Sequence, residues 1–268
     1  MRPIALRIAV LTLTLGLLGC HGGPGTGFHV TFGRQASEQF QWVGHVAEGQ
    51  RLEIKGVKGK IDARAAEGDQ VQVTVDRRGL RSDPDEVRIE VLEHEGGVTI
   101  CAVYPGDNVC LPGDAGRLRA QRNDVKVDFD VRLPTGVTLA ARTVDGQVDV
   151  TALDSNVEAR TVNGAIRIST AGHARAETVN GSIHAELGRV DWDGEAAFET
   201  VNGSVTVTLP REIHATVRAS TANGSISNDL PLDVTTSSRR RLEGTIGRGG
   251  RELHIETVNG SISISHAS

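Results

Sequence analysis

Aromatic residues are scarce in this chain of 268 residues, which has five Phe, two Trp and one Tyr. A compact core of this length usually buries several large aromatic side chains, each of which removes about 150 to 250 Å² from water. An aromatic content of 3% therefore predicts a thin core filled by Val, Ile, Ala and Leu. With 32 Gly and 8 Pro, the chain stays below the share typical of disordered low-complexity sequences, which favours a folded protein.

The sequence also lacks the ~18 consecutive apolar residues that a membrane-spanning helix requires. Its apolar stretch near the N-terminus, residues 8–18, follows Arg2 and Arg7 and ends at Gly19-Cys20. Charged, apolar and small residues in this order are typical of a secretory signal. We therefore predict a signal peptide over residues 1–19.

The end of this segment, Leu17-Leu18-Gly19-Cys20, resembles the bacterial lipobox, whose cysteine thiol receives a diacylglycerol and whose cleavage frees an amine for a third acyl chain. The resemblance implies lipid attachment at Cys20, and two or more acyl chains hold a protein stably on a membrane. The alternative is an unmodified signal peptide with a chance cysteine. His21 stands where Asp favours inner-membrane retention, so the resemblance also implies the outer membrane, with the periplasmic or surface side left open.

Residues 20–45 are interpreted as the lipid anchor and a tether, because their Gly-rich start is typical of flexible linkers. Loss of residues 1–19 removes Arg2 and Arg7, which takes the net charge from −5 to −7. Nucleic acid is a disfavoured partner for so acidic a chain, because clustered basic charge supplies most of that affinity.

Two further cysteines, Cys101 and Cys110, flank a Pro105-Gly106 turn. Export to an oxidising compartment favours a disulfide between them, and closing so short a loop stabilises a fold by about 2 to 3 kcal/mol in the chain-entropy model. Free thiols or a redox pair are the alternatives. A redox pair is disfavoured because redox-active motifs place two residues between their cysteines.

Internal repetition is the strongest signal in the sequence. Six copies of Thr-Val-Asn-Gly-Ser-Ile, or a close variant, occur between residues 143 and 262. In the second copy Ala159, Thr161 and Asn163 share one parity, whereas Arg160 and Val162 have the other. Because apolar residues share their face with Thr and Asn, we predict that Thr and Asn point inward and that the charged residues face water.

Two architectures fit these repeats. Asn-Gly between apolar runs is the strongest local signal of a hairpin, which would give an antiparallel meander with its turns about 10 Å apart. A parallel β-solenoid instead stacks the copies every ~4.8 Å, where one amide can donate to the next. Only the solenoid explains why nearly the same residues recur in every copy and why aromatics are scarce. The predicted ladder consists of Asp145, Asn163, Asn180, Asn202, Asn223 and Asn259.

We therefore predict an all-β fold, a parallel β-solenoid similar to a single-stranded β-helix. Residues 46–136 would form N-terminal β coils and a cap that carries the disulfide hairpin, and residues 137–268 the repeat solenoid. A degenerate copy, 56–61, places Lys58 at the Asn position, where we expect it to lie near Asp145 and neutralise it. Only three residues, 266–268, follow the last predicted strand, which predicts an uncovered C-terminal edge through which copies could associate.

Several motifs occurring in the same order resemble one known family. These are the tandem Thr-Val-Asn-Gly-Ser-Ile copies, Glu243-Gly-Thr-Ile-Gly247, and Ile100-Cys-Ala-Val-Tyr-Pro105. They resemble the bacterial putative-adhesin family of exported β-solenoid proteins, a domain of unknown function, over residues 44 to 266. The resemblance implies a coiled parallel β fold, while no residue of this chain demonstrates adhesion.

The sequence offers no pattern of catalytic or metal-ligating residues. Its nine histidines include no closely spaced metal-binding pair, and the outward positions mix charges without the acidic cluster that carbohydrate-active enzymes need. Arg239-Arg240-Arg241 is interpreted as loop surface that could touch anionic lipid. We predict a non-catalytic binding, adhesion or structural module of the cell envelope, without cofactor or metal, whose partner is an envelope protein or polysaccharide. The alternatives are a carbohydrate-active β-helix enzyme and a periplasmic scaffold in envelope stress or assembly.

One outward column stands apart because it is apolar. It consists of Val144, Val162, Val179, Val201, Ala222 and Val258. Such a column is either covered by another segment or exposed as a strip that marks partner contacts. Coverage by residues 28–48, with Phe40 and Trp42, is the favoured interpretation.

Overall fold

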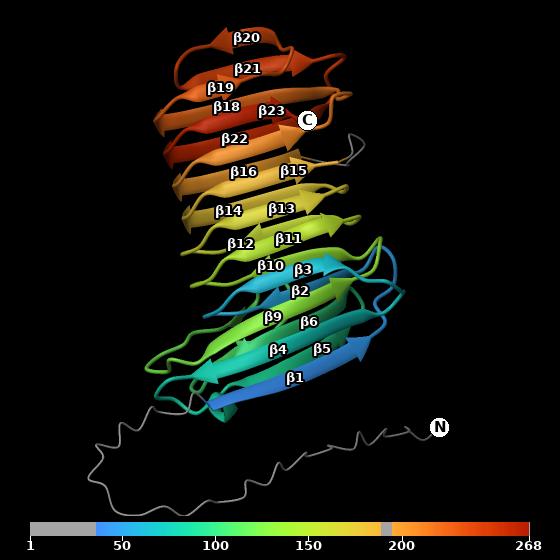
Figure 1. Ribbon diagram of the computed structural model, residues 1–268, viewed down its shortest axis with the longest axis vertical. Coiled ribbons are helices and arrows are strands. Elements are labelled where there is room, and N and C mark those ends of the chain that lie inside the picture. The colour runs from blue at the N-terminus through green and yellow to red at the C-terminus, as the bar shows by residue number, and fades with distance from the viewer. Residues whose placement is uncertain (1–35, 189–194, 268) are drawn as a thin grey trace, which may run out of the picture. The chain divides into compact units, whose positions relative to one another are not determined.

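The structure is a computed structural model, and it describes residues 36–188 and 195–267. The predicted signal peptide over residues 1–19, the predicted lipid site Cys20, and residues 21–35 of the predicted tether lie outside this range. The described part of the chain is almost entirely β, with a short 3-10 helix, η1 (Pro84–Glu86). Its strands form two long sheets and one small sheet (Figure 1).

The first sheet has ten strands in the order β1 (Ala36–Gly44), β4 (Val71–Gly79), β9 (Lys126–Leu133), β3 (Ile61–Ala65), β11 (Val148–Leu153), β13 (Ile166–Thr170), β15 (Ile183–Leu187), β17 (Val205–Leu209), β23 (Ile262–His266) and β19 (Ile226–Asn228). The second sheet has eleven strands in the order β20 (Asp233–Ser237), β21 (Arg241–Ile246), β18 (Ala215–Asn223), β22 (Arg251–Asn259), β16 (Glu195–Asn202), β14 (Ala174–Asn180), β12 (Val157–Arg160), β10 (Thr138–Arg142), β2 (Arg51–Lys55), β6 (Gly97–Val103) and β5 (Arg88–His94). The third sheet pairs β7 (Val109–Cys110) with β8 (Gly116–Arg117).

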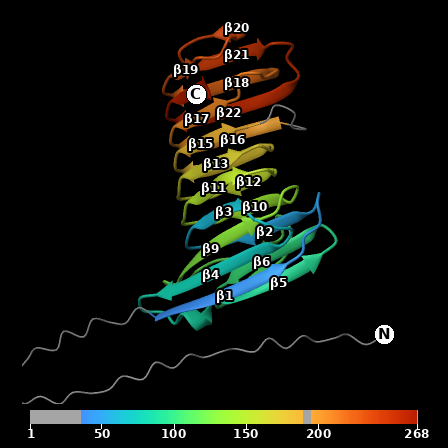
Figure 2. The same cartoon turned by 45° about the vertical axis from the view of Figure 1, so that its right-hand side comes forward.

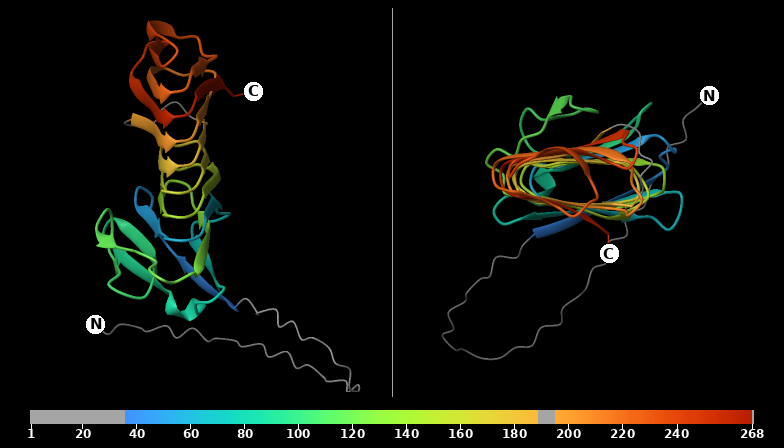
Figure 3. Two further views of the ribbon diagram at one scale, coloured as in Figure 1. Left: turned by 90° about the vertical axis from the view of Figure 1, so that its left-hand side faces the viewer. Right: turned by 90° about the horizontal axis from the view of Figure 1, so that it is seen from above.

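Each repeat forms one coil with a strand in each long sheet, and the Asn-Gly corner joins the two strands. Strands of neighbouring coils are parallel and in register, so that Thr178 lies opposite Thr200, and Thr200 opposite Thr257. Seen along the stack, the described coils superpose into a flattened tube (Figure 3, right). The predicted parallel β-solenoid is therefore confirmed, and the antiparallel meander is excluded for the repeats.

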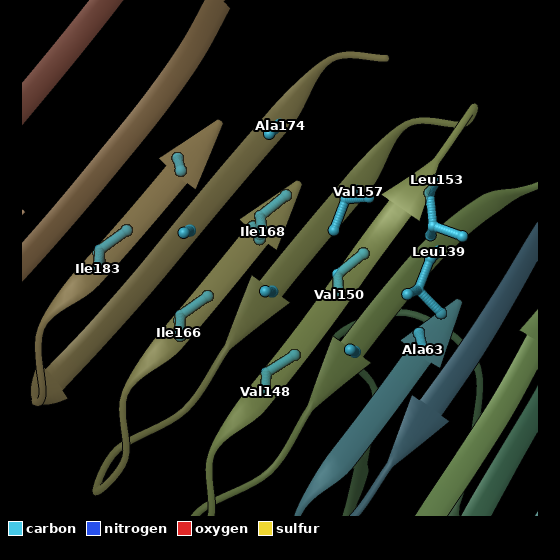
Figure 4. Packing of buried hydrophobic residues seen from close by; sticks show 14 of the residues in the cluster. Ala63, Leu139, Val148, Val150, Leu153, Val157, Ile166, Ile168, Ala174 and Ile183 are labelled. Atoms are coloured by element: carbon cyan, nitrogen blue, oxygen red, sulfur yellow. The ribbon is translucent and has the colours of Figure 1, made fainter. Parts of the chain in front are cut away.

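The core is a thin layer of aliphatic side chains between the two sheets. Val148 and Val150, Ile166 and Ile168, and Ile183 point into this layer and are buried (Figure 4). The alternation of residue types within each strand puts these side chains inside the coil and the charged neighbours outside. A narrow tube leaves little room for rings, which accounts for the scarcity of aromatics.

Antiparallel strands close the N-terminal end of the solenoid. β1 pairs with β4 and β4 with β9 in the first sheet, while β5 pairs with β6 in the second. Such atypical end units cover the open end of a stack of coils. Residues 36–44 form β1, the first strand of the described body. The predicted tether therefore ends before residue 36 and does not extend to residue 45.

The last coil in the sequence is not the last coil in the stack. β22 lies between β16 and β18 (Figure 2). β23 lies between β17 and β19. The C-terminal coil is thus inserted between two coils that precede it in the chain. The predicted uncovered C-terminal edge is therefore wrong, since both C-terminal strands have partners on either side.

The end of the stack beyond this coil is formed by residues 215–246. β21 pairs antiparallel with β18, and β20 pairs antiparallel with β21, so a hairpin extends the second sheet. In the first sheet the end strand is the short β19. A short strand and an antiparallel hairpin both limit edge-to-edge association.

Candidate functional site

The corner of each repeat begins with a buried threonine. The hydroxyl of Thr161 donates to the carbonyl of Gly146 at 2.8 Å, and the hydroxyl of Thr200 donates to that of Gly181 at 2.9 Å. Thr257 bonds in the same way to Gly203 at 2.8 Å. The prediction that threonine points inward is confirmed, and each hydroxyl ties its coil to the next.

The third residue of each repeat forms a continuous ladder of side-chain amides. Each amide nitrogen donates to the side-chain oxygen of the neighbouring coil at 2.6 to 2.9 Å. Along the stack the order is Asp145, Asn163, Asn180, Asn202, Asn259 and Asn223. The amides are exposed, so the prediction that they point inward is wrong. The chain bends at this corner, and the alternation of the strand ends at the threonine.

The ladder ends at Asp145, whose carboxylate accepts from the amide of Asn163 at 2.6 Å. Lys58 pairs with Asp145 through the backbone, as predicted for the degenerate copy. Its ammonium group, however, donates to the carbonyl of Asn123 at 2.8 Å. The partner of this ammonium group is therefore the carbonyl of Asn123. The expected ion pair with Asp145 does not explain where Lys58 lies.

Each corner requires a glycine because a side chain at this position would not fit. A Cβ atom on Gly203 would lie 2.0 Å from the carbonyl oxygen of Gly181, and a Cβ on Gly181 would lie 1.9 Å from that of Gly164. The same approach recurs at Gly146, Gly164, Gly224 and Gly260. Consecutive backbones therefore meet too closely at this corner for any side chain.

The apolar column is exposed over five coils, at Ala222 and at four valines, while Val144 is half-buried. Val162 is 38% exposed, and Val179, Val201 and Val258 are each 39% exposed. The favoured coverage by residues 28–48 is wrong for the part of that segment that the structure describes. Phe40 and Trp42 pack against the core from β1, in the other sheet.

A column of glutamates runs beside the valines. Glu177, Glu199 and Glu256 occupy equivalent positions on β14, β16 and β22, so they are neighbours in register. Together with Val179, Val201 and Val258 they line an open groove of about 490 Å³. Sequence reasoning missed this acidic cluster, because in chain order Ser220 separates Glu199 from Glu256.

The disulfide Cys101–Cys110 is present, and it lies well inside the chain, at the end of β6. The loop that follows it covers the outer face of the first coils. The ammonium of Lys55 donates to the carbonyls of Leu111 and Gly113, each at 2.5 Å, and Arg142 pairs with Asp114 at 2.5 Å. Burial lowers the pKa of Lys55 from its ordinary value.

Comparison with known proteins identifies the family of this solenoid. The family model described as Toastrack DUF4097 matches residues 48–265. The chain belongs to the Toastrack DUF4097 family. This match confirms the resemblance to a domain of unknown function that the repeats indicated. No curated protein matches the chain.

Several solved structures are similar to this chain at low sequence identity. A putative cell adhesion protein from Clostridium sporogenes is 13% identical with a TM-score of 0.50, and the match covers 87% of this chain and 100% of that one. A putative adhesin from Bacteroides fragilis is 9% identical with a TM-score of 0.30, over 86% and 97% of the two chains. A putative lipid binding protein from Parabacteroides distasonis is 14% identical with a TM-score of 0.31, over 87% and 97%. At 13% identity, the similarity to the Clostridium sporogenes protein concerns the fold alone.

The three arginines predicted to lie on a loop surface, residues 239–241, are exposed in the structure. Arg239 and Arg240 form an exposed bend between β20 and β21, and Arg241, also exposed, is the first residue of β21. Within the described residues no group of three or more His, Cys, Asp or Glu side chains is arranged to hold a metal ion. No described helix has the length and apolar character needed to cross a membrane.

The ladder of side-chain amides predicts that Asn202 contributes to stability through its amide group. The variant N202D loses the amide that donates to Asn180 and places a carboxylate against that carbonyl oxygen. We expect the free energy of unfolding to fall by about 1 to 2 kcal/mol, the cost of one lost hydrogen bond with an unsatisfied acceptor. Urea denaturation measures it. The control D145N, at the end of the ladder where only an acceptor is needed, should stay within about 0.5 kcal/mol; equal losses in both variants would exclude a directional ladder.

Proposed function

We propose that this chain is an exported lipoprotein whose Toastrack solenoid is a non-catalytic binding or adhesion module of the cell envelope. The observation that carries the binding role is the exposed groove, in which valines at equivalent positions of three coils remain uncovered, with Val162 exposed at the same position of the adjoining coil. Contiguous apolar surface of this kind usually marks a partner contact. A stack of hydrogen-bonded coils holds such a strip straight and rigid, as repeat proteins commonly do for their binding surfaces.

Attachment to the envelope is supported by the N-terminal sequence. Residues 1–19 have the order of a secretory signal and end at the lipobox-like Leu17-Leu18-Gly19-Cys20. The disulfide Cys101–Cys110 agrees with export, because disulfides persist in oxidising compartments. Acyl chains on Cys20 would place the protein on the outer membrane, with the solenoid joined to the anchor through residues 21–35.

The stacked glutamates are the observation that favours a carbohydrate-active alternative. Such enzymes use two carboxyl groups, about 5 to 9.5 Å apart, that flank the scissile bond on opposite sides of the sugar ring. Here Glu177, Glu199 and Glu256 stand in single file on one outer face, in register with one another. A single file cannot place an acid and a base on opposite sides of one ring, so the binding role is the better supported.

One experiment with three proteins tests both parts of the proposal. In the native host we expect the unaltered chain to fractionate with the membrane and to retain envelope material. C20S should be released from the membrane, and V179K/V201K should stay anchored but lose the retained material. Protease or glycan hydrolase treatment distinguishes a protein partner, as a periplasmic scaffold would have, from a polysaccharide. Membrane-bound C20S, or unchanged retention by V179K/V201K, would overturn the corresponding part.

A further inference from the structure

The groove differs from a row of stacked aspartates in the first sheet. In the first sheet Asp130, Asp62 and Asp149 also stack in register. There each carboxylate has its own cation, since Arg64 pairs with Asp130, Lys60 with Asp62, and Arg167 with Asp149. Stacked carboxylates are thus compensated within the chain on that face.

The groove lacks this compensation at its centre. Glu177 pairs with Arg160 at 3.2 Å, and Glu256 lies 3.4 Å from His254, which carries a charge only when protonated. Glu199 stands between the two glutamates and has no ion pair with another described residue. Like charges directly opposite on neighbouring strands are destabilising. A destabilising feature beside an exposed apolar strip indicates a functional surface, because natural proteins usually break such rules at functional sites.

The two columns define what can fit. Glutamate and valine lie two residues apart along each strand, so the acidic and apolar columns run side by side, about 6.6 Å apart. Along the stack each column repeats every ~4.8 Å. A partner must therefore present a cationic row and an apolar row, both with nearly this repeat.

An α-helix laid along the stack satisfies this condition. Positions i, i+3, i+7 and i+10 of a helix span about 15 Å at 1.5 Å per residue. The four valines span about 14 Å at 4.8 Å per coil. Alternate residues of an extended strand repeat every ~6.6 Å and would need about 20 Å for the same four contacts. The repeat of the groove thus favours a helix over a strand.

We propose that the groove, together with the exposed Val162 of the adjoining coil, binds a basic amphipathic helix of about three turns. The groove residues that would contact this helix are Val179, Val201, Val258, Glu177, Glu199 and Glu256. The inference rests on the proposed binding role and specifies its partner. Helix-in-groove recognition uses apolar anchors at i, i+3 and i+7, and Lys or Arg on the adjacent row would pair with the glutamates. A second copy of this chain would bring the same valines and glutamates, and so would leave Glu199 uncompensated.

The test uses a labelled synthetic peptide and the full exported chain carrying C20S. The peptide has fourteen residues, with Leu at i, i+3, i+7 and i+10 and Lys on the neighbouring row. We expect fluorescence anisotropy to show binding that weakens as salt is raised, because exposed ion pairs are screened. A peptide with Glu in place of Lys, and one of the same composition with strand periodicity, should each bind at least 10-fold more weakly.

Protein variants locate the site. E199K and V179K/V201K should each weaken peptide binding at least 10-fold. E199K should be no less stable than the parent, since it replaces the central one of three stacked glutamates and so removes repulsion. The matched control is E186K, which makes the same charge change on β15 in the other sheet. Unchanged binding by E199K, equal binding of the strand-period peptide, or a dimer that buries the groove in sedimentation would overturn the inference.

The outcome is separable from that of the proposed function. If V179K/V201K loses envelope material while the basic helical peptide shows no preference for the groove, only the helix inference fails. If the peptide binds as expected but envelope retention is unaffected by V179K/V201K, the proposed envelope role of the groove fails instead.

Discussion

A chain that ends at Gly250 should melt at least 10 °C below the full chain. This truncation removes β22 and β23, whose Leu253, Ile255, Ile262 and Ile264 are fully buried. Each such side chain contributes about 1.5 to 3 kcal/mol, so the loss is about 6 to 12 kcal/mol. That is comparable with the whole stability of about 5 to 15 kcal/mol expected for a folded protein. Circular dichroism on heating measures the change.

The inserted position of this coil makes the effect larger than trimming a terminus would suggest. Without it, β18 and β19 lose the parallel partners that they have among the described strands. A chain that ends at His266 is the control and should melt within about 2 °C of the full chain, because both strands remain. The substitution I255A keeps every strand and should cost about 2 to 5 kcal/mol. If the chain that ends at Gly250 has the same melting temperature as the control, the inserted coil does not hold the stack together.

Replacing the corner glycine of a central coil should have the second largest effect. In G203A the new methyl group would lie 2.0 Å from the carbonyl oxygen of Gly181, a backbone atom that cannot rotate away. The two coils must separate, which strains the hydrogen bond from the amide of Gly181 to the carbonyl of Asn202. We expect a loss of about 3 kcal/mol or more, at the upper end for overpacking, measured by urea denaturation.

Gly68 supplies the matched control for this prediction. A Cβ atom there would meet nothing within 4 Å. The variant G68A should therefore change the free energy of unfolding by no more than about 0.5 kcal/mol, or increase it slightly by restricting the unfolded chain. A G203A protein as stable as G68A would show that the corner accepts a side chain and that the stacking distance is not limited by its glycines.

Local alternation predicted the faces of the strands correctly and then failed at the corner. Ala159 and Thr161 are buried and Arg160 is not, as their parity requires. Asn163 has the same parity yet is exposed, because the chain bends between the two sheets and the period-two rule holds only within a strand. The ladder survives this change, since an amide at the corner still reaches its copy on the next coil.

The sequence indicated only one of the two columns that form the candidate groove, the column of valines. Spacing alone identified the outward valines, because each copy places one at the same position. Their exposure depends on which segments pack over them, and the loop held by Lys55 and Arg142 covers only the first coils. Glu256 joins Glu199 only in the folded stack.

The sequence by itself determined the repeating coil, its parallel stacking, the buried threonines and the partner of Cys101, because these depend on spacing and residue type along the chain. The order of the coils was decided only by the tertiary structure. Every copy offers the same backbone edge and the same Thr, Asn and Gly corner, so any copy can stack on any other. The connection through β20 and β21 places β22 beside β16, and this order covers the C-terminal strands and completes the acidic groove.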